Sequence, residues 1–282
     1  MHTKGCIIVL LLALSCCQNP SASQEANGKQ PGPVVNPAGP TIGERFAPPV
    51  GYSRTPAGSF GTYLRALPLH QHGYAVHLYN GAEKTGRDVH AAVLRTDVGS
   101  KDLQQCADAV IRLRAEYLYQ SGDFDSISFN FTNGFPAAFS KWRNGYKIDV
   151  RGNEASWVRS GDADGTYGSF RRYLDIVFMY AGTLSLSRQL QQVPFHEMQP
   201  GDVLIQGGSP GHAVIVVDMV QNDKGNKMFM LAQRYMPAQE IHVLHNFNNK
   251  AISPWYDMAD IETIVKTPEW EFTTSDLKRF RE

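Results

Sequence analysis

The chain has few cysteines and no excess of charge, and both absences narrow what it can be. Cysteine occurs four times in 282 residues, as Cys6, Cys16, Cys17 and Cys106. Because the first three are crowded near the start, this set can build neither a disulfide framework nor a zinc cluster. Lysine plus arginine equals aspartate plus glutamate, so the formal net charge is +0. No basic patch is evident, and nucleic acid is not an expected partner.

Long apolar runs are scarce as well. The run over residues 7–14 follows Lys4 and has signal-peptide length, too short to span a bilayer. It leads into Ala13-Leu14-Ser15-Cys16, which resembles the lipobox of bacterial lipoproteins. The resemblance implies a signal peptide over residues 1–15, lipidation of Cys16, and an exported protein anchored in the cell envelope, in the outer membrane. Cys17 as the acceptor, or an ordinary secretory leader, are the alternatives.

Composition then divides the rest of the chain into two parts. Residues 16–49 are rich in Ser, Asn, Gly, Pro and Ala and have no periodic apolar pattern, which predicts a disordered tether. With 42% hydrophobic residues in the chain, residues 50–282 are long and apolar enough to form one globular domain with a sizeable core.

The order of expected elements indicates an α+β fold, with helices first and a meander of antiparallel strands afterwards. Apolar spacing predicts a helix over about 101–119, with Ser100 as its N-cap and Cys106 on its apolar face. A second helix is expected over about 167–190, and 142–159 reads as irregular. The expected strands are 75–79, 90–94, 127–132, 203–206, 213–219, 228–234 and 241–244.

Cys106 is the candidate nucleophile. A thiol needs its thiolate form to attack a carbonyl, and both a helix N-terminus and an imidazole partner favour that form. His212 begins an apolar strand directly after a glycine-rich loop and is the candidate base. Gln233, on the next strand, shares a face with His212 if the intervening turn keeps an even register, and would then orient its ring.

Three more residues near this pair are candidates for binding substrate. They are Gln105, beside the thiol, and Ser209 and Gly211, in the loop before the histidine. Gln104 or Gln105 is also placed to donate a hydrogen bond to an oxyanion.

The order of Cys106, then Gly201-Asp202-Val203-Leu204-Ile205, then His212 resembles the NlpC-type branch of papain-like cysteine hydrolases. The resemblance implies a papain-like fold with central helices packed on an antiparallel β-meander. It also implies cleavage of an amide or ester, such as a cell-wall peptide, by a Cys–His dyad with a polar third residue. The Asp-Cys-Ser-Gly signature of that branch is replaced here by Gln105-Cys106-Ala107-Asp108.

Nearly all of the chain after the tether is also similar to an uncharacterised family of bacterial lipoproteins, a domain of unknown function. The similarity rests on residues 63–69, 102–119, 207–218 and 231–239. It implies that the chain is a bacterial lipoprotein of this kind, and it implies no particular activity.

A non-catalytic interpretation stands beside the enzymatic one. Free cysteine is among the most buried residue types, so Cys106 is equally suited to packing on an apolar helix face. The same fold would then serve a lipoprotein that binds glycan or peptide, with its four tryptophans as groove candidates. In either case the expected partners are an envelope peptide or glycan and, through the lipid anchor only, the membrane.

The sequence indicates no cofactor and no metal site. His70, His72 and His77 are close together in sequence, but they lack carboxylates at ligand spacing.

Overall fold

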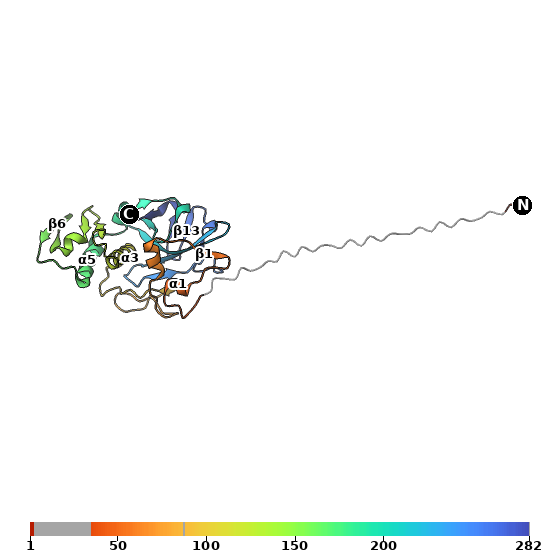
Figure 1. Cartoon of the computed structure of the whole chain (residues 1–282), viewed down its shortest axis with the longest axis horizontal. Helices are drawn as coiled ribbons and strands as arrows, with labels where there is room; N and C mark the ends of the chain where they lie inside the picture. Colours follow the sequence, from red (N-terminus) through yellow and green to blue (C-terminus); the bar gives the residue numbers. More distant parts are fainter. Residues whose placement is uncertain (3–34, 87, 282) are drawn as a thin grey trace. The chain divides into compact units, whose positions relative to one another are not determined.

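The structure is a computed structural model that describes residues 1–2, 35–86 and 88–281 (Figure 1). The expected signal peptide and lipidation site, Cys16 included, lie outside these residues. The described residues from Val35 onward belong to one compact unit. None of the helices within the described ranges is both long enough and apolar enough to cross a membrane.

The unit is built on a nine-stranded antiparallel sheet, which confirms the α+β class. The strand order is β2-β11-β10-β9-β8-β15-β7, with β1 paired to β9 and β12 paired to β10. The bounds are β1 Tyr52–Arg54, β2 His90–Val93, β7 Gln191–Gln192, β8 Val203–Gln206, β9 His212–Asn222, β10 Lys227–Gln233, β11 His242–Leu244, β12 Tyr256–Asp257 and β15 Leu277–Arg279.

Both faces of this sheet are covered, as the strand β9 shows, since its residues 212–220 are all buried. Ala213 and Ile215 pack into the larger core cluster, which also contains the apolar side chains of helix α3. Val214 and Val216 point the other way, into a smaller cluster that includes Phe272. Successive side chains of a strand alternate between the faces, so the two clusters lie on opposite sides of the sheet.

The described residues form six helices, of which only α3 and α5 are long. They are α1 Ile42–Arg45, α2 Ser59–Arg65, α3 Cys106–Gln120, α4 Phe139–Arg143, α5 Tyr167–Tyr180 and α6 Thr183–Gln189. Three small hairpins complete the fold: β3 Ser128–Asn130 with β4 Pro136–Ala138, β5 Tyr146–Arg151 with β6 Glu154–Arg159, and β13 Ile264–Lys266 with β14 Glu271–Thr273. Figure 1 shows α5 and β6 at the opposite end of the unit from β1 and β13.

The folded part begins earlier than residue 50. Ile42 and Phe46 are buried in the main cluster, and the Arg45 guanidinium donates to the carbonyls of Gly39 and His70. Residues 35–49, expected within the tether, are therefore packed against the domain. A single turn of helix with two apolar residues is too short for its periodicity to stand out in a sequence rich in Pro and Gly.

Four local expectations also differ from the structure. The helix expected from 101 starts at Cys106, with Gln105 rather than Ser100 as its N-cap, because Gln105 and Asp108 form a reciprocal capping box. The helix expected over 167–190 is two helices, interrupted at 181–182 between α5 and α6. Residues 142–159, expected to be irregular, contain the β5–β6 hairpin, and 75–79 makes only isolated bridges.

Candidate active site

Cys106 is the first residue of α3, and the capping box fixes that position. The backbone N–H of Gln105 donates to Asp108 Oδ2 at 2.9 Å, which holds the carboxylate under the first turn. The backbone N–H groups of Cys106 and Ala107 act to lower the pKa of the thiol. Because the first N–H groups of a helix have no partner within it, they are available to stabilise a thiolate at Sγ.

The sulfur lies at the open edge of β9. Gly201 donates to the Val216 carbonyl and the Val216 N–H donates to Asp202, so the backbone groups of Val216 face β8. By the alternation of an antiparallel strand, those of Gly211 and Ala213 face the opposite edge, towards β10.

The pairing of β10 with β9 ends before it reaches these groups, at Ala232 opposite Ile215. Cys106 fills the vacant edge. Its thiol donates to the Gly211 carbonyl with an Sγ···O distance of 4.0 Å, and the backbone N–H of Ala213 acts to lower the pKa of the thiol. The thiol therefore lies against the backbone on both sides of His212.

The His212 ring is held in one orientation by an amide. Its Nε2 is 2.8 Å from Gln233 Oε1, while Gln233 Nε2 donates to Glu269 Oε2 at 2.6 Å. A carboxylate only accepts hydrogen bonds, so the Gln233 amide must present its oxygen to His212, and Nε2 of the ring must carry the proton. The lone pair of the imidazole is then on Nδ1. No hydrogen bond of the described residues involves Nδ1, and none joins the ring to Cys106 Sγ.

His242 completes the network behind Gln233. Its Nδ1 is 3.0 Å from the Glu240 carbonyl and therefore donates, which leaves Nε2 to accept from Gln233 at 3.4 Å. Lys84 pairs with Glu269 at 2.7 Å and supplies the countercharge. Every polar group of Gln233 is thus engaged, which is the condition for a buried amide to hold one orientation.

Aromatic rings enclose the imidazole. The ring centroids of Tyr235, Trp270 and Phe272 lie 5.0, 5.3 and 5.9 Å from that of His212, which is 1% exposed. Trp270 is positioned by a hydrogen bond of 3.0 Å from its Nε1 to Gln206 Oε1. Phe272 is buried, whereas Tyr235 and Trp270 are half-buried, so the latter two form the part of this enclosure that reaches solvent.

Burial sets the protonation states of both candidate groups. It raises the pKa of the Cys106 thiol to about 11, with Asp108 as a further cause, against the opposing effect of the surrounding N–H groups. It lowers the pKa of His212 to about 4, against the opposing effect of the Gln233 hydrogen bond. Near neutral pH both groups are therefore neutral, a thiol at Cys106 and an imidazole at His212.

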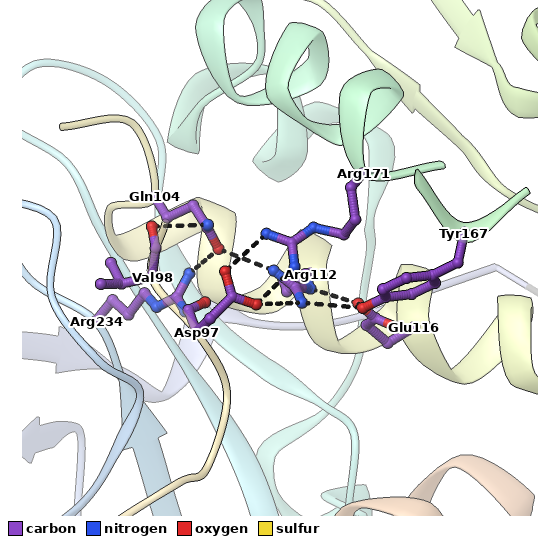
Figure 2. Close-up of polar contacts among 8 residues, drawn as sticks. All are labelled: Asp97, Val98, Gln104, Arg112, Glu116, Tyr167, Arg171 and Arg234. Atoms are coloured by element: carbon purple, nitrogen blue, oxygen red, sulfur yellow. Dashed lines mark hydrogen bonds and ion pairs between the residues drawn. The ribbon is translucent and has the colours of Figure 1, made fainter. Parts of the chain in front are cut away.

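A polar network on the face of the sheet that α3 covers, opposite the face of His212, fixes the segment before Cys106 (Figure 2). Gln104 Oε1 accepts from Arg234 and, at 3.4 Å, from Arg112, while its Nε2 donates to the Val98 carbonyl at 2.9 Å. One N–H of the Gln104 amide is therefore engaged with backbone, and the side chain is buried, so of the two glutamines expected near an oxyanion Gln104 serves the network in the structure.

The same network ties α3 to α5. Arg112 bonds Glu116 at 2.7 Å, and Tyr167 of α5 donates to the same carboxylate at 2.8 Å (Figure 2). Asp97 bridges Arg112 and Arg171, and its hydrogen bond from Arg171 holds the pKa of its carboxyl well below its usual range. The helix that carries Cys106 is thereby held by charge pairs as well as by apolar packing.

The three predicted binding residues have different surroundings. Gln105 caps α3, and its side chain donates to Asp102 Oδ1 at 3.3 Å. Ser209 is exposed on the loop between β8 and β9. Gly211 is required by packing, because a Cβ there would lie 2.5 Å from Thr183 Oγ1. Since Thr183 also donates to the Gly208 carbonyl at 3.2 Å, the loop before His212 is fastened to α6.

Sequence reasoning missed Glu269, His242 and Lys84. Glu269 stands beside Trp270, one of the four tryptophans considered for a groove, and an acidic residue next to a tryptophan was a signal for a polar role near an aromatic wall. His242 lies on β11, where side chains alternate between the two faces of the sheet, so the face of this histidine could have been predicted. Lys84 comes from an irregular segment, so no periodic pattern pointed to it.

The histidines considered for a metal do meet a carboxylate in the structure. His70 Nε2 and His77 Nδ1 lie 3.5 and 3.3 Å from the two oxygens of Glu240, a residue remote in sequence. His72 is exposed and does not join them. No cluster of three or more His, Cys, Asp or Glu side chains in the described segments could hold a metal ion.

Fold and site together define an α+β domain with a buried cysteine and histidine at one edge of its central strand. The chain belongs to the family described as Domain of unknown function (4846), whose model matches residues 42–279. Neither the search of curated proteins nor the search of solved structures gave a match. The expected membership of an uncharacterised family is confirmed to that extent.

Proposed function

We propose that this protein is an exported, lipid-anchored cysteine hydrolase with a papain-like arrangement of its site. Cys106 is the nucleophile, His212 the base and then the acid, and Gln233 the residue that orients His212. One observation supports this most strongly. The hydrogen bond to the Gln233 amide leaves the His212 lone pair on Nδ1, while the Cys106 sulfur lies against the backbone that flanks the same histidine.

The protonation states suit attack through a neutral pair. As Cys106 Sγ bonds to the carbonyl carbon of an amide or ester, its proton passes to His212 Nδ1. The positive ring is stabilised through Nε2–H by Gln233, and through it by Glu269. His212 then gives the proton to the departing amine or alcohol, leaving a thioester at Cys106. Water, deprotonated by the same nitrogen, hydrolyses the thioester and restores the thiol.

The backbone N–H groups at the sulfur also serve the reaction. Those of Cys106, Ala107 and Ala213 converge on Sγ, where negative charge would otherwise be unfavourable in a buried site. Gln105, Ser209 and Gly211 lie next to these groups in the chain and remain the proposed binding residues. No metal or organic cofactor is needed for this chemistry.

The proposed substrate is a cell-wall peptide, by resemblance to NlpC-type hydrolases. Lipidation at Cys16 would hold the domain at the envelope, in the outer membrane, where such peptides occur. The membrane is contacted through the anchor only, and nucleic acid is not a proposed partner. Tyr235 and Trp270 are the half-buried rings beside His212, so a substrate entering the site would contact them first.

The experiment is to incubate the domain with peptides released from peptidoglycan and to follow new products by liquid chromatography and mass spectrometry. Wild-type protein is expected to release product, and Cys106→Ala and His212→Gln are expected to release none. His196→Gln is the matched control, because His196 is exposed and outside the site. Product formed equally by the Cys106→Ala protein would contradict the proposal.

The raised pKa and burial of Cys106 favour a second candidate function, a non-catalytic lipoprotein that binds glycan or peptide. In that case the same peptides bind wild type and Cys106→Ala equally well by calorimetry, and no product appears. The same set of protein variants therefore distinguishes the two candidate functions.

A further inference from the structure

The reaction proposed for Cys106 places a negative charge on the carbonyl oxygen of the substrate. In hydrolases such an oxyanion is stabilised by hydrogen-bond donors that are in place before the reaction begins. The two glutamines that precede the thiol already have contacts of their own: Gln104 donates to backbone at 2.9 Å, and Gln105 donates to Asp102 at 3.3 Å. The side chains around His212 are therefore the next source of a donor.

Tyr235 is held close to the thiol by its neighbours in the chain. On one side of it, Arg234 donates to the side-chain oxygen of Gln104. On the other side, the backbone N–H of Ala238 donates to Asp102 Oδ1 at 2.7 Å. Both acceptors lie just before the nucleophile in the chain. The stretch that carries Tyr235 is therefore fastened on either side to the segment that leads into α3.

The ring of Tyr235 lies on the face of the sheet that carries His212. Side chains alternate along a strand, so a residue two positions after Gln233 is expected on the face of Gln233, which bonds His212. The ring centroids of Tyr235 and His212 are 5.0 Å apart, with an interplanar angle of 64°. Lys84 Nζ lies 5.6 Å from the centroid of the tyrosine ring. An imidazole and a cation thus bound this ring and limit its orientation.

The phenol hydroxyl of Tyr235 is able to donate to a ligand. No hydrogen bond among the described residues involves this hydroxyl, and the residue is half-buried. Burial raises the pKa of Tyr235, and the charges of Glu269 and Cys106 raise it further. The hydroxyl therefore keeps its proton at neutral pH and is a donor. The effect of Cys106 also means that the thiol and the phenol are close enough to interact.

The other two rings that enclose His212 do not offer such a donor. Trp270 has one N–H group, and its Nε1 donates to Gln206 Oε1 at 3.0 Å. Phe272 has no polar group. Of the three rings, only that of Tyr235 carries a donor that has no partner in the described structure.

We propose that Tyr235 is a further catalytic residue, whose phenol O–H donates a hydrogen bond to the oxyanion. This inference rests on the function proposed for Cys106. As Sγ bonds to the carbonyl carbon, the π electrons of the C=O bond move to the oxygen, which becomes negative. Tyr235 donates to that oxygen and keeps its own proton. When the C=O bond forms again, the amine or alcohol leaves with the proton from His212 and the thioester remains.

Such a hydrogen bond acts on the rate because it strengthens during the reaction. A donor bonds a charged oxygen about twice as strongly as a neutral carbonyl. The contact therefore stabilises the transition state more than the bound substrate, which is the condition for catalysis. It also predicts that the hydroxyl matters only in reactions that pass through an oxyanion.

Two reagents test this prediction in the full-length protein, with the product on Cys106 measured by peptide mass spectrometry. p-Nitrophenyl acetate acylates the thiol through an oxyanion, whereas iodoacetamide alkylates it by displacement of iodide, without one. Tyr235→Phe keeps the ring and removes only the hydroxyl. It should slow acylation by about tenfold or more and leave alkylation at the same pH within about twofold of wild type. Tyr180→Phe, exposed at the end of α5, is the control and should match wild type in both reactions.

Each way of failing has its own signature. Acylation of Tyr235→Phe at the wild-type rate would overturn the inference and leave the proposed function intact. Equal slowing of acylation and alkylation would also overturn it, because the hydroxyl would then act on the thiol rather than on the oxyanion. Absence of acylation on Cys106 in wild type would contradict the proposed function itself, and the inference with it.

Discussion

The guanidinium of Arg234 is hydrogen-bonded to the side-chain oxygen of Gln104. Arg234 directly follows Gln233, which holds His212 on the opposite face of the sheet, and Gln104 lies two residues before Cys106. The end of β10 therefore positions both halves of the candidate site, one through each of two consecutive side chains. A change at this contact is expected to affect the thiol although neither residue touches it.

Gln104→Met tests that connection through stability. The substitution keeps the volume but removes the acceptor of the fully buried Arg234, whose Nε already has no partner in the described structure. Leaving a buried charged donor unpaired costs about 2–3 kcal/mol. Urea unfolding should show this loss, whereas Gln120→Met, at the exposed end of the same helix, should stay near wild type. Equal stability of the two variants would contradict the assigned role of Gln104.

Asp108→Asn should make Cys106 more reactive. Asp108 is one cause of the raised thiol pKa, and Asn keeps an oxygen for the Gln105 N–H while it removes the charge. Alkylation by iodoacetamide at about pH 9 should therefore be faster in the variant than in wild type. Asp125→Asn, at an exposed loop, is the control. A slower reaction in Asp108→Asn would show that its charge does not act on the thiol.

The pH dependence of wild-type alkylation follows from the same pKa. Because the folded thiol has a pKa of about 11, its reaction rate should still be rising above pH 9. In the urea-unfolded protein, where a free thiol titrates near its ordinary value of about 8.5, the rate should level off earlier. A native rate that is already constant at mildly acidic pH would show a resting thiolate instead.

Acid should destabilise the fold through two buried histidines. Burial lowers the pKa of His212 to about 4 and of His242 to about 3, so the unfolded chain binds these protons first. Their stabilising contribution is present above about pH 6.5 and is lost as the pH falls through 4 and then 3. Denaturant unfolding across this range should show a falling free energy of unfolding. The fall should be shallower in His212→Gln; an unchanged slope would contradict the low pKa.

The strands around the site could be predicted from sequence, because β8, β9 and β10 are continuous apolar runs bounded by turn residues. The pairing of His212 with Gln233 depended on register, which only the structure determines. The expected start of α3 lies five residues before the observed one. The sequence around Gln105 and Asp108 offers several cap patterns, and their capping box is only one of them.

Contacts between distant segments could not be predicted. Glu269 reaches Gln233 across 36 residues, and Arg234 reaches Gln104 across 130. Such pairs depend on how hairpins and loops fold back on the sheet, which no local pattern encodes. The position of Cys106 at the edge of β9 has the same origin, because it requires β10 to leave the pairing at Ala232.

The proposed function requires that Cys106 form a covalent acyl intermediate with the help of His212. Mixing the domain with p-nitrophenyl acetate and measuring intact mass within seconds tests it directly. Wild type should gain one acetyl group on Cys106, located by peptide mapping, and then lose it by hydrolysis. His212→Gln should acetylate far more slowly and Cys106→Ala not at all. Acetylation of Cys106 at the same rate in wild type and His212→Gln would contradict the claim.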